Sequence, residues 1–129
     1  MDRVAILLIG ILTGVLLTMV MEADADEEKP VYVLVSAAPK SEPEELRAYA
    51  EAAGPLARAA GLEILARIPS VPDELVFEGS WPHTGGITIE KFESMAAFRA
   101  FWNSEAYQAA IPLREGKVDL NFVVAVPAS

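Results

Sequence analysis

The chain has 129 residues, a formal net charge of −9 and no cysteine. This length suits one domain of ordinary size, and the lack of cysteine excludes a disulfide framework, thiolate chemistry and zinc sites of the cysteine type. The acidic balance argues against docking on nucleic acid or on an anionic membrane surface, because both depend on Lys and Arg neutralising phosphate groups. We therefore expect no nucleic-acid partner.

An apolar segment near the N-terminus carries no charged residue from Val4 to Met21. A helix of this length would span about 27 Å, slightly less than the hydrocarbon core of a bilayer. The following Ala23-Asp24-Ala25 has the small-x-small pattern that a signal peptidase reads. Two interpretations stay open: a signal peptide cleaved after Ala25, or an uncleaved membrane anchor through residues 4–21.

The domain organisation follows from this segment. Residues 1–25 are predicted to be a signal peptide or membrane anchor, residues 26–30 an acidic tether, and residues 31–127 the folded domain. Under either interpretation the domain reaches the non-cytoplasmic side of the membrane. We therefore expect a protein of the bacterial cell envelope, exported or anchored in the inner membrane.

The first half of the folded part is predicted as strand, helix and strand. Alternating apolar residues indicate strands over 31–37 and 62–68. Between them, Ser41 and Glu44 form a capping box for a helix that runs to about residue 60. The inner side of this helix is rich in alanine and consists of Leu46, Tyr49, Ala50, Ala53, Leu56, Ala57 and Ala60.

The second half repeats this order with one short addition. The predicted elements are a short edge strand over 74–78, a loop over 79–86, a strand over 87–92, a helix capped by Ser94, a short helical turn over 105–111 and a strand over 118–126. Apart from the short edge strand, the resulting order β-α-β-β-α-β is the ferredoxin-like pattern, an α+β fold in which two helices cover one face of a sheet.

The sheet face away from the helices is predicted to mix large apolar and charged side chains. Its expected members are Tyr32, Leu34, Glu63, Leu65, Arg67, Thr88, Glu90, Phe92, Asp119, Asn121 and Val123. An exposed patch of this kind marks an interaction site, and a two-fold partner would cover it. We expect a homodimer, with Arg67 paired to Glu90 or Asp119; a half-polar solvent face on a monomer is the alternative.

Four segments in the second half of the chain resemble a known bacterial family. They are Glu78-Gly79-Ser80-Trp81-Pro82, Ile87-Thr88-Ile89-Glu90-Lys91-Phe92, Phe101-Trp102-Asn103-Ser104-Glu105-Ala106-Tyr107-Gln108 and Pro112-Leu113-Arg114. In this order they are similar to domain-of-unknown-function family 1330, over roughly residues 31–126. The resemblance implies a ferredoxin-like dimer that closes into a dimeric α/β barrel. It implies no settled activity, and the exported N-terminus departs from the common family pattern.

Few residues are candidates for chemistry. His83 is the single histidine, so a multi-histidine metal site is excluded, and we predict neither a metal nor a cofactor. The candidate catalytic residues are Glu90, Tyr107 and Arg114, and the candidate ligand-binding residues are Tyr32, Arg67, Trp81, Asn103 and Arg114. Arg114 would hold an anion such as a carboxylate. The structural alternative is that Ser104 caps a second helical turn, which Tyr107 and Arg114 lock to the body.

Three hypotheses for function remain open from the sequence. The first is a homodimeric domain that binds a small apolar or weakly acidic ligand in the sheet cavity. The second, implied by fold relatives of the family, is a cofactor-independent oxygenase or isomerase. The third is a membrane-tethered module whose sheet face meets another protein.

Overall fold

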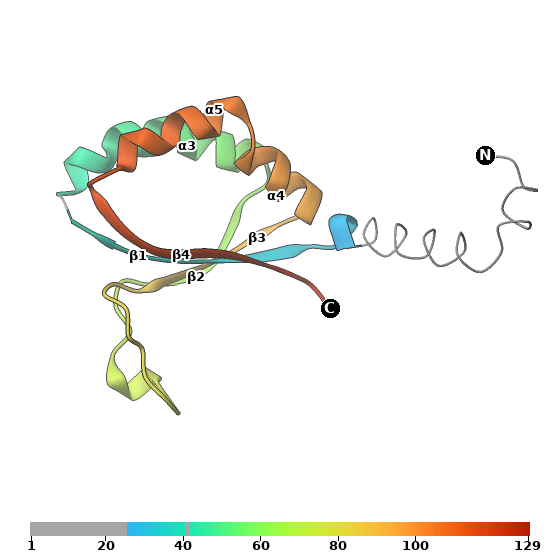
Figure 1. The fold of residues 1–129 in the computed structure, drawn as a ribbon. Coiled ribbons are helices and arrows are strands. Elements are labelled where there is room, and N and C mark those ends of the chain that lie inside the picture. Colours follow the sequence, from blue (N-terminus) through green and yellow to red (C-terminus); the bar gives the residue numbers. More distant parts are fainter. Residues whose placement is uncertain (1–25, 41) are drawn as a thin grey trace, which may run out of the picture.

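Four antiparallel strands form a single sheet in the order β2-β3-β1-β4. The computed structural model describes residues 26–40 and 42–129. Its elements are β1 (Val31–Pro39), η1 (Pro43–Leu46), α3 (Arg47–Ala59), β2 (Glu63–Ile68), η2 (Asp73–Leu75), β3 (Ile87–Phe92), α4 (Met95–Trp102), α5 (Glu105–Ala110), η3 (Ile111–Arg114) and β4 (Val118–Pro127). The helices cover one face of the sheet (Figure 1). This confirms the predicted α+β, ferredoxin-like architecture.

The predicted N-terminal leader or anchor lies outside the described residues. In residues 26–40 and 42–129, no helix combines the length and the apolar character needed to cross a membrane. The residues just before β1 contact the domain: Glu27 forms an ion pair with Arg99 of α4 at 2.9 Å. The carbonyl of Lys29 also accepts a hydrogen bond from the backbone N–H of Met95, at the start of α4.

The helix starts follow the serine pattern of the sequence. The Ser94 hydroxyl accepts a hydrogen bond from the Ala97 N–H at 3.0 Å, and Ser104 does the same for Tyr107 at 3.2 Å. Both predicted caps are therefore confirmed. Ser41 is not among the described residues, so the predicted capping box with Glu44 stays a prediction.

The predicted edge strand over 74–78 is not formed. Instead, the backbone N–H of Leu75 donates to the carbonyl of Pro72, and that of Val76 donates to Asp73. These local bonds make the short η2 turn, so the segment has no free row of backbone groups for a neighbouring strand.

The core lies between β1, β3 and the helices. Val31, Val33, Phe92 and Met95 are its buried members. Phe92 faces the helices and is only 2% exposed. Thr88 and Glu90 face the helices too, because residues two apart in a strand share a face.

Two β-bulges change which side chains face the helices. In β4, Leu120 pairs with Ala37 but Phe122 pairs with Ser36, which leaves Asn121 as the extra residue. Leu120 and Val123 therefore both face the helices although they are three residues apart. Each extra residue reverses the alternation beyond it.

The second bulge has the same effect in β2. Ile64 pairs with Glu90 and Ala66 pairs with Ile89, so Leu65 is the extra residue. Ile64 and Arg67, again three residues apart, line the same space below the helices.

The predicted composition of the uncovered face is wrong for several residues. The structure places Arg67, Thr88, Glu90, Phe92 and Val123 on the helix side. The bulges explain Arg67 and Val123. For the three residues of β3, both faces of the sheet carry large apolar side chains, so alternation alone does not tell which face the helices cover. The expected ion pairs are also not found: among the described residues, Asp119 pairs with Lys40 at 3.6 Å and not with Arg67.

The uncovered face is more apolar than predicted. Strand pairing places Leu34 between Ile89 and Val124, and Ala66 continues this row onto β2. Val124 is 47% exposed, although it belongs to an apolar row. Charged residues lie toward the edge of the face, where Glu63 of β2 is opposite Lys91 of β3 in the strand register.

The connection between β2 and β3, residues 69–86, forms an arm on the side of the sheet away from the helices (Figure 1). The Ser36 hydroxyl fixes its base by donating to the carbonyl of Gly86 at 2.8 Å. Asn121, the bulge residue of β4, donates to the carbonyl of Thr84 at 2.8 Å. Farther along the arm, Phe77 is 94% exposed.

Candidate functional site

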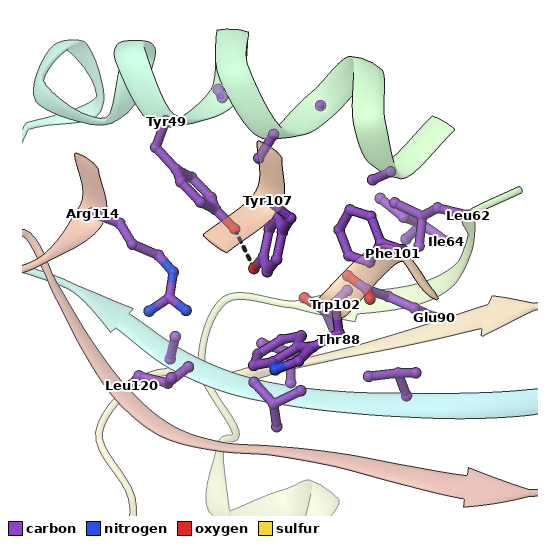
Figure 2. Close-up of a pocket in the computed structure, with 18 of the residues that line it drawn as sticks. Tyr49, Leu62, Ile64, Thr88, Glu90, Phe101, Trp102, Tyr107, Arg114 and Leu120 are labelled. Carbon is purple, nitrogen blue, oxygen red and sulfur yellow. Dashed lines mark hydrogen bonds between the residues drawn. The ribbon is translucent and has the colours of Figure 1, made fainter. Parts of the chain in front are cut away.

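A cavity of about 640 Å³ lies between the helices and the sheet (Figure 2). This volume falls within the range of small-molecule pockets, roughly 300 to 1,000 Å³. Most of its walls are apolar, including the alanines of α3 and the aromatic side chains of α4. The polar side chains that line it are Tyr49, Arg58, Arg67, Thr88, Glu90, Tyr107 and Arg114.

The small side chains of α3 leave this space open. Ala50, Ala53 and Ala57 lie along the helix side that faces the cavity. An alanine projects too little to reach a sheet packed below a helix, so a row of three leaves room. The alanine-rich inner side was visible in the sequence and is the signal that could have predicted a cavity here.

Two tyrosines and an arginine form one polar cluster in the cavity. The hydroxyls of Tyr49 on α3 and Tyr107 on α5 share a hydrogen bond of 2.9 Å. The Arg114 guanidinium of η3 lies over the Tyr49 ring, with its central carbon 5.6 Å from the ring centroid. This distance is that of a cation–π contact. Tyr107 is only 5% exposed and touches the ring of Phe101.

Tyr49 acts as a neutral hydrogen-bonding group. Burial raises the pKa of Tyr49 well above its usual value, and the hydrogen bond between Tyr49 and Tyr107 raises it further. The positive charge of Arg114 opposes this shift only in part. Tyr49 therefore keeps its proton at physiological pH and serves as a donor or acceptor rather than as a base.

Local sequence explains how this cluster is positioned. The Ser104 cap starts α5 so that Tyr107 falls in its first turn, on the buried side. Pro112 sits at the start of η3, where its missing N–H costs no hydrogen bond. The short turn then delivers Arg114 to the cavity just before β4.

Among the residues that the structure describes, Glu90 is the one carboxylate that lines the cavity. Burial raises the pKa of the Glu90 carboxyl, and the positive charge of Arg67 opposes the shift. In the part of the chain that the structure describes, Glu90 makes no ion pair. It therefore takes up a proton more readily than a solvated glutamate, a property typical of carboxyls that exchange protons with a ligand.

The polar groups stand at two ends of the cavity (Figure 2). Arg114 and the tyrosine pair occupy one end, and Glu90 lies at the other, near Leu62 and Ile64. The apolar walls between them can contact the body of a ligand, while each end can recognise a different polar group.

Four of the seven sequence-predicted site residues line this cavity: Arg67, Glu90, Tyr107 and Arg114. Tyr49 and Thr88 line it too, but the sequence did not single them out. Tyr49 was expected on the inner side of its helix, where its hydroxyl has no sequence signal of its own.

The other three predicted residues lie elsewhere. Tyr32 is on the uncovered face of the sheet, where it pairs with Lys91 and Val126. Asn103 is exposed at the end of α4, beside a separate cavity of about 300 Å³. The structure does not bring either of them to the polar cluster.

Trp81 and His83 belong to the arm. Trp81 donates a hydrogen bond from its indole N–H to the carbonyl of Gly85 at 3.1 Å. Its ring packs edge-on against His83, and both rings contact Phe122 on the uncovered side of β4. These contacts fix the arm to the sheet. Within the described ranges, no cluster of His, Cys, Asp and Glu could hold a metal ion.

Comparison with solved structures supports the fold. A protein of unknown function from Rhodopseudomonas palustris is similar with a TM-score of 0.62 and 18% identity, covering 87% of this chain and 92% of that chain. A methylated form of that protein gives a TM-score of 0.61 and 17% identity, covering 87% and 90%. At this level of identity the likeness shows the fold alone.

A lower similarity is found to a dimeric ferredoxin-like protein of unknown function from Thermobifida fusca. Its TM-score is 0.46 with 12% identity, covering 80% of this chain and 92% of that chain. Among curated proteins, none matches this sequence.

The family model agrees with the resemblance seen in the sequence motifs. It matches the whole folded part, from the residue before β1 to the last residue of β4, residues 30–127. The chain therefore belongs to the family described as "Domain of unknown function (DUF1330)".

Proposed function

We propose that this chain is a homodimeric domain that binds a small, mostly apolar ligand in the helix–sheet cavity of each protomer. The observation that carries the proposal is the 640 Å³ cavity with apolar walls and a few convergent polar side chains. This combination is typical of small-molecule sites. The cavity replaces the inter-sheet space expected from the sequence, because the polar side chains come from the helices and from the helix-facing side of the sheet.

The uncovered face supports the dimer. Leu34, Ile89 and Val124 form an apolar row there, and a patch of this kind is unfavourable in water. A second copy is the simplest cover, because a two-fold interface brings the same patch against itself. The charged Glu63 and Lys91 at the edge would then form a polar rim.

The arm completes the proposed interface. Four strands about 4.8 Å apart and about 3.3 Å long per residue give the face a flat area of roughly 400 Å². Stable interfaces bury about 800 Å² per partner, so we expect a further contribution. The arm extends on the same side as the uncovered face (Figure 1), and its exposed Leu75 and Phe77 can pack on the second copy.

Native mass spectrometry of the full chain, extracted in mild detergent, tests both parts of the proposal. We expect the mass of two chains and a released small molecule. A strict monomer would contradict the dimer. A dimer that releases nothing, and that binds no member of a panel of small apolar acids and alcohols, would contradict ligand binding.

Ligand binding can also be tested by filling the cavity. Ala57→Leu adds side-chain volume on its α3 wall, whereas Ala59→Leu is the matched control on the exposed side of the same helix. We expect the first variant to lose the co-purifying molecule and the second to retain it. Equal retention by both variants would contradict the assignment of the ligand to this cavity.

A second candidate function is a cofactor-independent isomerase. The observation in its favour is Glu90, whose carboxyl lines the cavity with a raised pKa and can therefore take a proton from a ligand and return it. If so, the purified wild-type protein converts its co-purifying molecule into an isomer, and Glu90→Gln binds the molecule unchanged. If the wild type and Glu90→Gln do not differ in isomer formation, the isomerase function is contradicted and only the binding function remains.

Export of the domain is a further part of the proposal. It rests on the uncharged segment between Val4 and Met21 and on the small-x-small pattern that follows. Fractionation of cells that produce the full chain should place the domain outside the cytoplasm. Mass analysis of the isolated protein then tells whether residues 1–25 are still attached.

A further inference from the structure

We propose that the cavity ligand is a small organic carboxylate with an apolar body, and that its carboxylate binds between Arg114 and the Tyr49–Tyr107 hydroxyl pair. This inference rests on the proposed function and adds the chemical class and the orientation of the ligand.

The first argument is the contrast between Arg114, one of three arginines that line the cavity, and the cations of the surface. Four exposed cations hold a carboxylate within 4.0 Å: Lys29, Lys40, Arg47 and Arg99. In the described part of the chain no carboxylate pairs with Arg58, Arg67 or Arg114, and of these three only Arg114 is partly buried. The protein carries a net charge of −9, so acidic side chains are not scarce.

An arginine without a carboxylate partner in a partly buried site is ready to bind an anion. Its guanidinium is planar and presents several N–H donors in a fork that matches the two oxygens of a carboxylate. The Tyr49 ring holds the guanidinium in place by a cation–π contact, with its central carbon 5.6 Å from the ring centroid. The cluster is thus oriented before a ligand arrives.

The tyrosine pair adds one more donor. Two hydroxyls carry two protons, and the 2.9 Å bond between them uses one. The second proton is free to point at an acceptor in the cavity. Burial raises the pKa of Tyr49, so the Tyr49 hydroxyl keeps its proton throughout the physiological pH range.

Glu90 at the opposite end sets the orientation. When ionised, its carboxylate repels a second carboxylate and interacts electrostatically with Arg67, so the anion of a ligand is favoured at Arg114 (Figure 2). Thr88 lines the cavity on the same strand and can hydrogen-bond a neutral polar group of the ligand. Between the two ends, Phe101 and Trp102 offer aromatic contact to the ligand body.

Isothermal titration calorimetry of the full chain with two matched probes tests this inference. Phenylacetate carries the carboxylate, and phenylacetamide is its neutral isostere. We expect phenylacetate to bind at least tenfold more tightly, because charge-assisted hydrogen bonds are about twice as strong as neutral ones.

Three variants locate the preference. Arg114→Met keeps much of the side-chain length and should abolish the tenfold difference between the probes. Arg47→Met removes an exposed arginine that already pairs with Glu44, and it should leave the difference intact. Tyr49→Phe should reduce the difference by a smaller factor, since it removes one hydroxyl but no charge. Circular dichroism checks that each variant is folded.

The outcomes separate the two proposals. Equal binding of both probes, or a difference that survives Arg114→Met, overturns the carboxylate inference and leaves the ligand-binding function standing. Failure of both probes to bind up to millimolar concentration overturns both. If Arg114→Met does not fold, Arg114→Lys is tested instead. A lysine has the charge but not the fork, so it should keep only part of the preference for phenylacetate, and an unchanged preference overturns the carboxylate inference.

Discussion

The two faces of the sheet carry apolar side chains in similar numbers but differ in what surrounds them. On the helix side, the apolar walls enclose polar side chains whose hydrogen bonds and charges point inward, such as Tyr107 and Glu90. On the uncovered side, the apolar row of Leu34, Ile89 and Val124 has charged residues only at its edge. The first arrangement suits a small ligand, and the second suits a flat partner.

This comparison teaches that apolar content alone does not assign a sheet face to a function. The placement of the polar groups decides it. Groups in the centre of a face need a ligand or each other as partners, whereas groups at its rim can remain in water. Each prediction below changes one face and asks whether the other responds.

The largest effect is expected from Leu34→Asp on the uncovered face. The substitution places an unpaired carboxylate in the apolar row of both copies, and burial of such an ion costs several kcal/mol. We expect a monomer by analytical ultracentrifugation at concentrations where the wild type is a dimer. Ala48→Asp, on an exposed position of α3, is the control and should stay dimeric. A dimeric Leu34→Asp protein would rule out this face as the interface.

The next largest effect concerns the arm. Phe77→Ala removes a ring that is 94% exposed in the single chain. If the ring packs on the second copy, its loss should weaken the dimer by about 2 kcal/mol, or roughly 30-fold in dissociation constant. If the ring is in water in the dimer as well, its truncation would leave the free energy of dissociation unchanged. An unaltered dissociation constant would therefore restrict the interface to the sheet face.

The tyrosine pair gives a smaller and more local effect. Tyr49→Phe and Tyr107→Phe each remove one side of the same 2.9 Å hydrogen bond. Each should lower the free energy of unfolding by about 1 kcal/mol, and the double variant should cost little more than either single one. Urea unfolding at fixed protein concentration measures this. Fully additive losses would mean that the two hydroxyls do not depend on each other.

The smallest effect is a pH dependence at Glu90. Its folded pKa is raised by burial, so the folded state binds the proton more tightly than the unfolded state does. Stability should therefore fall as pH rises from the unfolded value of about 4.3 through the raised folded value. Glu90→Gln should remove this slope, so its stability relative to the wild type should increase with pH across that window. A constant difference would indicate that Glu90 is solvated.

Much of the fold could be predicted from the sequence because its signals are local. The order of strands and helices follows from apolar periodicity, and the starts of α4 and α5 follow from Ser94 and Ser104. The prediction of a strand over 74–78 was wrong because the alternation of this segment resembles that of a strand, whereas its backbone hydrogen bonds are made locally in the η2 turn.

The assignment of the faces could not be predicted because it depends on contacts between distant residues. The bulge at Asn121 is accompanied by hydrogen bonds to Ser36 and Thr84, which lie on another strand and on the arm. A single extra residue of this kind moves Arg67 or Val123 to the other face. For the same reason, the contact between Tyr49 and Tyr107 could not be predicted, because it depends on how α3 packs against α5.

The most direct test of the account is the protection of Val124 in solution. The chain has no cysteine, so Val124→Cys and the exposed control Ala48→Cys each carry a single thiol. In an isolated chain Val124 is 47% exposed and would be labelled by a water-soluble maleimide. The account predicts that the Val124→Cys thiol is labelled much more slowly than the control and becomes reactive when the dimer is diluted apart. Equal labelling rates at all concentrations would show that the uncovered face stays bare, and would contradict the central claim.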